Sequence, residues 1–197
     1  RAAGANLRVT LRMFGSVRAD GRAPVVLFTY ANPLVRMGLP AFAREAAAAG
    51  VDGVLALDLP IEEAEDFRRI LADAGLDTIF LLSPTTTPAR IARAAHLGRG
   101  FLYCISRLGV TGARDTVAAD ARDLIRRIRA HTDLPIALGF GISRPEHVAE
   151  VGAYADAAVV GSALVSLIAG AGSSPRLLDD VTAFVGGLRR ACESARA

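Results

Sequence analysis

Three glycine-containing stretches of the sequence carry residue types that can bind a phosphate group. They are residues 106–112 (Ser-Arg-Leu-Gly-Val-Thr-Gly), residues 139–143 (Gly-Phe-Gly-Ile-Ser) and the pair Gly161-Ser162, and each adjoins an apolar run. Glycine lets the backbone approach an anion closely because it has no Cβ. A helix that begins at Ser162 would add unpaired N–H groups and a partial positive charge. Because a Gly-Ser pair is also an ordinary helix cap, the prediction of a phosphate site depends on all three stretches together.

The elements that must position these stretches follow from the apolar pattern. Six short apolar runs with little polar alternation are typical of parallel strands covered by helices. The runs span residues 25–30, 53–57, 78–82, 100–106, 136–140 and 157–160. Helical patterns with start and stop signals separate them. These helices are expected at residues 7–14, 39–49, 61–74, 88–97, 116–131, 145–151, 162–169 and 177–191.

A helix followed by six strand–helix units predicts an α/β fold, either an open doubly wound sheet or a TIM (β/α)₈ barrel. The barrel is favoured because a helix directly follows the last strand, as at many barrel phosphate sites. The first unit also lacks the Gly-x-Gly-x-x-Gly fingerprint of the open nucleotide-binding sheet. Since such a barrel has eight strands, we expect residues 1–197 to be a single, incomplete TIM-barrel domain. Its first two strands and first helix would lie upstream of Arg1, and its open edges predict poor stability.

The composition excludes several classes of function. The chain has a net charge of +3 and all its basic residues are arginines, so no mechanism can use a lysine. The sequence contains no basic stripe with interleaved aromatic residues, so a nucleic-acid partner is not expected. No apolar run is long enough to cross a membrane. Cys104, Cys192 and the three histidines lack the spacing of metal ligands. We therefore expect no metal and no disulfide, and a reducing cytoplasm as the compartment.

Six loops in order along the chain resemble those of the tryptophan synthase alpha subunit family. The resemblance runs from end to end of the sequence. Residues 107–112 resemble the family's closing active-site loop, and residues 139–143 and 160–163 resemble its phosphate loops. The other matching stretches are Phe-Thr-Tyr-Ala-Asn-Pro at 28–33, Gly-Val-Asp-Gly-Val at 50–54 with Asp-Leu-Pro at 58–60, and Ser-Pro-Thr-Thr at 83–86.

The resemblance implies cleavage of indole-3-glycerol phosphate to indole and glyceraldehyde 3-phosphate in tryptophan biosynthesis. It implies that Tyr103 lines the pocket near the glycerol portion and that Thr111 orients a catalytic aspartate. The implied phosphate ligands are Gly112, Gly141, Gly161 and Ser162. The implied indole pocket consists of Phe28, Tyr30, Leu55, Leu81 and Phe140. The side facing the partner would carry Asn32, Pro33, Asp58 and Pro60.

The sequence departs from the family's pattern at the catalytic carboxylates. The family's glutamate and aspartate lie in and after its second strand, within a Ser-Asp-Pro-x-Ala-Asp-Gly-Pro stretch that these residues do not contain. We therefore expect no catalytic residue in this chain and an inactive polypeptide. The implied partner is the beta subunit of an α₂β₂ heterotetramer. Pyridoxal phosphate is expected only in that partner, and no cofactor in this chain.

Two alternatives stay open from the sequence. One is another phosphosugar barrel, an isomerase or epimerase, although no Asp, Cys or His at a strand end is a persuasive catalytic candidate. The other is a phosphate-binding barrel that acts as a non-catalytic partner or activator of a beta-type subunit. Asp58 ends a strand, but the resemblance makes it an interface and loop-coupling residue rather than a catalytic one.

Overall fold

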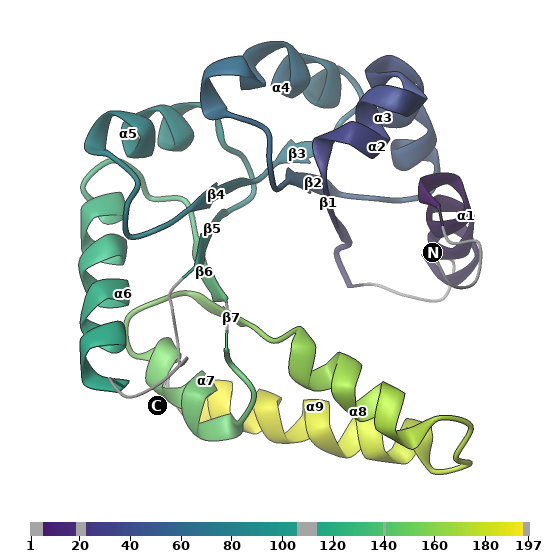
Figure 1. Cartoon of the computed structure of the whole chain (residues 1–197), viewed down its shortest axis with the longest axis vertical. Helices are drawn as coiled ribbons and strands as arrows, with labels where there is room; N and C mark the ends of the chain where they lie inside the picture. Colours follow the sequence, from purple (N-terminus) through teal and green to yellow (C-terminus); the bar gives the residue numbers. More distant parts are fainter. Residues whose placement is uncertain (1–5, 19–22, 106–113, 140, 195–197) are drawn as a thin grey trace. The chain divides into compact units, whose positions relative to one another are not determined.

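The computed structural model describes residues 6–18, 23–105, 114–139 and 141–194, with the backbone alone for residues 114–119 (Figure 1). The chain divides into two compact units, residues 1–81 with 92–102, and residues 82–91 with 103–197. Within the described residues, no helix is both long and apolar enough to cross a membrane.

A three-stranded parallel sheet forms the centre of the first unit, in the order β1-β2-β3. Its register pairs Phe28 with Leu55, and Gly53 with Asp77. The unit contains α1 (Leu7–Arg18), β1 (Val26–Thr29), α2 (Ala31–Met37), α3 (Leu39–Ala48), β2 (Gly53–Ala56), the 3₁₀ turn η2 (Ile61–Glu63), α4 (Ala64–Asp73) and β3 (Asp77–Thr78).

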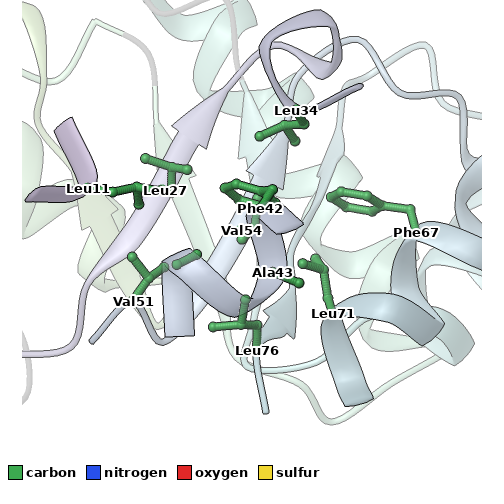
Figure 2. Close-up of a cluster of buried hydrophobic side chains, with 11 residues drawn as sticks. Leu11, Leu27, Leu34, Phe42, Ala43, Val51, Val54, Phe67, Leu71 and Leu76 are labelled. Atoms are coloured by element: carbon green, nitrogen blue, oxygen red, sulfur yellow. The ribbon is translucent and has the colours of Figure 1, made fainter. Parts of the chain in front are cut away.

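The register assigns alternate side chains of these strands to opposite faces. Leu27 and Val54 are partners, and both are buried in a cluster with side chains of α3 and α4 (Figure 2). Phe42 and Leu71, which come from those helices, are almost fully buried there. Each such side chain contributes about 1.5–3 kcal/mol by leaving water. Phe28 and Leu55 are the next pair and therefore lie on the other face of the sheet.

An aspartate bridges the beginnings of β1 and β2. Asp52 Oδ2 accepts the N–H of Val25 at 2.7 Å. Arg18, at the end of α1, pairs with Asp52 and also donates to the carbonyl of Ala23. Gly50 leaves room for this arginine, because a Cβ there would lie 2.6 Å from Arg18 Cγ. We call this Asp–Arg arrangement a carboxylate bridge, because it ties two strand starts and a helix end together.

A four-stranded sheet, in the order β4-β5-β6-β7, lies mainly in the second unit. β6 and β7 are parallel, with Gly139 opposite Val159. Helix α9 packs along α7 and α8 (Figure 1). The elements are β4 (Phe80–Leu82), α5 (Pro88–Leu97), β5 (Leu102–Ile105), α6 (Arg114–Arg129), β6 (Ile136–Gly139), α7 (Pro145–Gly152), β7 (Ala157–Val159), α8 (Ser162–Ala171) and α9 (Leu177–Ser194).

A second carboxylate bridge closes the β6–β7 pair. Asp156 Oδ2 accepts the N–H of Ile136 at 2.7 Å. Arg129, at the end of α6, pairs with Asp156 and donates to the carbonyl of Leu134 at 3.0 Å. The two bridges share the same parts, an aspartate directly before one strand and an arginine from the helix before its neighbour.

The expected order of strands and helices is confirmed, with two differences. The run at 78–82 forms two strands, because Asp77 and Thr78 pair with β2 while the later residues pair with β5. Residues 31–37 form a helix, α2, where the sequence predicts a loop. Pro33 is tolerated there because it falls in the first turn, where an N–H has no partner within the helix.

Candidate functional site

In the first unit, the predicted indole-pocket residues share one face of the sheet. Phe28 is 52% exposed, and its register partner Leu55 is only 1% exposed. Gly53 lies on the same face as these two, and a Cβ there would come within 2.6 Å of Ile79 Cδ1. The absence of a side chain at residue 53 therefore lets Ile79 cover this face. From the sequence, Gly53 is only part of the matching stretch at 50–54 and Ile79 has no role, although glycine in a strand is a known sign of close approach.

The remaining predicted pocket residues differ in how far the structure describes them. Leu81 is partly buried in β4. Tyr30 is 60% exposed and precedes the first residue of α2. Phe140 lies outside the described residues. The structure thus brings Phe28 and Leu55 together on one face, with Tyr30 just after the end of β1.

The predicted partner-facing residues lie on two adjacent connections of the first unit. Asn32 and Pro33 are exposed in the first turn of α2, and Pro60 is exposed just before η2. Asp58 is exposed as well, and its Oδ1 accepts the N–H of Ala31 at 2.6 Å. This hydrogen bond joins the two connections, so the structure brings these residues together.

In the second unit, Tyr103 of β5 lies against Gly139 of β6. A Cβ at residue 139 would lie 2.0 Å from Tyr103 Oη, so only glycine leaves the phenol in place. Tyr103 is 9% exposed. Burial raises the pKa of its hydroxyl, with a smaller contribution from Cys104. The hydroxyl is therefore protonated at neutral pH and can donate a hydrogen bond.

The predicted phosphate ligands follow two neighbouring strands of this unit. Gly141 comes two residues after β6, and Gly161 and Ser162 follow β7. Because β6 and β7 are parallel and in register, these residues leave the sheet at the same edge. Gly141 has φ +77, a conformation that favours glycine. All three residues are exposed.

Helix α8 offers its first turn at this edge. It begins at Ser162, and no side chain among the described residues caps it. A Cβ at Gly161 would meet no atom within 4 Å, so the approach to this turn is open. Free N–H groups at a helix start and the helix dipole both favour an anion. The other predicted residues of this site, Thr111 and Gly112, lie outside the described residues.

A histidine holds the connection that follows Gly141. His147 Nδ1 accepts the N–H of Ser143 at 3.4 Å, and Nε2 lies 3.1 Å from the Arg144 guanidinium. Ile142 is buried and anchors the same stretch. From the sequence, His147 is considered only as a metal ligand, a role that its spacing excludes. Its position in the first turn of α7, four residues after Ser143, is the signal that could have identified the contact.

The whole chain is similar to one family of enzymes. The sequence model of the family described as "Tryptophan synthase alpha chain" matches residues 2–193. The tryptophan synthase alpha chain of Solibacter usitatus is 46% identical over 188 residues, which are 95% of this chain and 70% of that relative. The alpha chain of Methylococcus capsulatus is 48% identical over 178 residues, covering 90% and 67% respectively.

Solved structures agree with the sequence matches. Tryptophan synthase subunit alpha from Legionella pneumophila is 33% identical with a TM-score of 0.84, over 94% of this chain and 69% of that one. The tryptophan synthase α₂β₂ complex of Pyrococcus furiosus contains a chain that is 38% identical with a TM-score of 0.82, over 93% and 75%. The expected α/β TIM-barrel fold is confirmed by these similarities.

Proposed function

Because this chain belongs to the tryptophan synthase alpha chain family, a family of lyases in tryptophan biosynthesis, we propose that its residues bind indole-3-glycerol phosphate for cleavage. One observation carries the proposal. Gly141 and the open first turn of α8 follow two neighbouring parallel strands at one edge, beside the strand that bears Tyr103. This arrangement offers N–H donors to a phosphate and a protonated hydroxyl to the group attached to it.

The roles of the individual residues in this proposal are those that the family resemblance implies. In the second unit, Gly141, Gly161 and Ser162 bind the phosphate, together with Gly112, and Tyr103 faces the glycerol portion. In the first unit, Phe28 and Leu55 supply an apolar wall for the indole ring, because they lie side by side on one sheet face. Tyr30 and Leu81 extend that wall, and Phe140 has the same proposed role.

The proposed cleavage is a retro-aldol-type step. An acid protonates the indole ring carbon, a base removes the proton of the glycerol hydroxyl, and the carbon–carbon bond between them breaks. Two carboxylates with different pKa values suit this division of tasks. The family's Ser-Asp-Pro-x-Ala-Asp-Gly-Pro stretch does not occur in these 197 residues. We therefore propose that they bind the substrate but do not turn it over by themselves, and that Thr111 would orient the aspartate.

The proposed partner is a tryptophan synthase beta subunit in an α₂β₂ assembly. The similar Pyrococcus furiosus structure is a tryptophan synthase α₂β₂ complex, and the similar Mycobacterium tuberculosis structures are tryptophan synthases. Asn32, Pro33, Asp58 and Pro60 form the proposed contact surface. The proposed chemistry assigns pyridoxal phosphate to the beta subunit and gives this chain no cofactor. Its compartment is proposed to be the reducing cytoplasm, in keeping with two free cysteines.

A charge at Ser162 tests the phosphate site. Ser162→Asp places a carboxylate at the first turn of α8, where it suits the helix dipole but repels a phosphate. Glycerol 3-phosphate titrated by calorimetry should bind the unsubstituted chain and bind Ser162→Asp at least about tenfold more weakly. Ser166→Asp, an exposed serine one turn later on the same helix, is the matched control and should bind as the unsubstituted chain does. Equal affinities of the two variants for glycerol 3-phosphate would contradict the proposed site.

A further inference from the structure

The carboxylate of Asp58 accepts a hydrogen bond from within the chain. Its Oδ1 lies 2.6 Å from the backbone nitrogen of Ala31, the first residue of α2. Tyr30 precedes this helix and makes no side-chain cap, and Pro33 has no N–H to offer. Asp58 therefore satisfies an N–H that the helix itself leaves without an acceptor, and its negative charge suits that end of the helix.

The backbone around Asp58 holds the carboxylate in this place. Leu57 donates its N–H to the carbonyl of Thr29 at 2.9 Å, which extends the β1–β2 pairing by one residue beyond β2. On the other side, Ile61 is buried and Leu59 packs against the core cluster. Asp58 is thus fixed from both directions, and the contact with Ala31 follows from the sheet register.

We propose that Asp58 is a positioning residue for partner binding, and this inference rests on the proposed function. Its carboxylate fixes the first turn of α2, and this turn presents Asn32 and Pro33 to the beta subunit. The charge of Asp58 is used inside the chain rather than against a cation of the partner. The two connections that follow β1 and β2 therefore act as one preformed surface, which lowers the entropy lost on binding.

The same strand pair provides a matched control. Asp52 Oδ2 accepts the N–H of Val25 at 2.7 Å, at the beginnings of β1 and β2. Asp58 accepts the N–H of Ala31 just beyond the ends of the same two strands. Removal of either carboxylate deprives a backbone N–H of its acceptor and lowers stability. Only Asp58 lies beside Asn32 and Pro33.

The test measures the dissociation constant for the beta subunit of the Mycobacterium tuberculosis enzyme, at a temperature where every variant is folded. Asp58→Ala should bind about tenfold more weakly than the unsubstituted chain. Asp58→Asn keeps an oxygen that accepts the Ala31 N–H, so it should recover most of the affinity. Asp52→Ala should lose stability and keep the affinity. Hydrogen exchange at the Ala31 amide should accelerate in Asp58→Ala alone.

Each contrary result identifies a different failure. If Asp58→Asn binds as weakly as Asp58→Ala while its Ala31 amide stays protected, the charge contacts the partner directly and the positioning role is wrong. If Asp52→Ala loses as much affinity as Asp58→Ala, the effect is general destabilisation. Unchanged binding by Asp58→Ala overturns the inference and leaves the proposed function intact. If the unsubstituted chain does not bind, the proposed partner is wrong and the inference falls with it.

Discussion

The hydroxyl of Tyr103 occupies the place that a side chain at residue 139 would need. A Cβ on Gly139 would lie 2.0 Å from Tyr103 Oη and 2.6 Å from Cζ. Since the two residues belong to β5 and β6, neither backbone can retreat without disturbing a sheet. The phenol therefore sets the size limit at residue 139, and glycine there keeps the phenol in its buried position.

We expect Gly139→Ala to lower the free energy of unfolding by about 1–3 kcal/mol, the usual cost of overpacking. The variant should also weaken binding of glycerol 3-phosphate, because Tyr103 has to move. In a Tyr103→Ala background the added methyl meets open space and should cost much less. Urea unfolding of the four chains of this double-mutant cycle measures the coupling. Additive effects of the two substitutions would show that the contact carries no energy.

The stability of the chain should fall in alkaline solution because Cys104 is buried. Burial raises the pKa of this thiol from its ordinary value of 9.0 to about 12. The folded chain thus keeps a proton that the unfolded chain releases, so the stabilisation is complete below pH 9 and is lost as the pH rises toward about 12. Tyr103 and Tyr154, whose pKa values are raised from 10.0 mainly by burial, add to the loss at higher pH.

Cys104→Ala should therefore show a shallower decline in unfolding free energy between pH 9 and 10 than the unsubstituted chain, measured by urea denaturation at each pH. The slope with pH is the quantity to compare, since the substitution also changes packing at every pH. Cys192→Ala is the control, because Cys192 is exposed, and its slope should match that of the unsubstituted chain. Identical slopes for all three chains would contradict the prediction.

Removal of the second carboxylate bridge should destabilise the chain. Asp156→Ala leaves the N–H of Ile136 and the Arg129 guanidinium without this acceptor. We expect a loss of about 1–3 kcal/mol in the free energy of unfolding, typical of a hydrogen bond to a charged group. Asp133→Ala, at an exposed aspartate of the preceding connection, should change stability by less than about 0.5 kcal/mol. Comparable losses in the two variants would show that the bridge contributes little.

The short apolar runs and the helical periodicity of the sequence were sufficient to predict the order of strands and helices. Leu27 and Val54 are examples, because each belongs to a short apolar run that indicates a buried strand from the local sequence alone. Gly161 and Ser162 could be assigned to a helix start for a similarly local reason, a glycine and a hydroxyl before an apolar helix. These features depend on residues that are neighbours in the sequence, so they can be predicted from the sequence.

The features that could not be predicted from the sequence depend on residues far apart along the chain. Asp58 was expected to face a partner, and its bond to the N–H of Ala31 follows from strand register, which no local pattern specifies. Ile79 covers the face beside Gly53 for the same reason. Helix α2 was missed because Asn-Pro in a short segment resembles a turn, while the sheet and Asp58 stabilise the helix from outside.

The two carboxylate bridges have a consequence for how this chain can be rearranged. One ties α1, β1 and β2 together, and the other ties α6, β6 and β7 together. Each segment carries its own arginine, aspartate and amide. A chimeric chain in which one segment replaces the other would therefore bring a complete set of these end contacts with it.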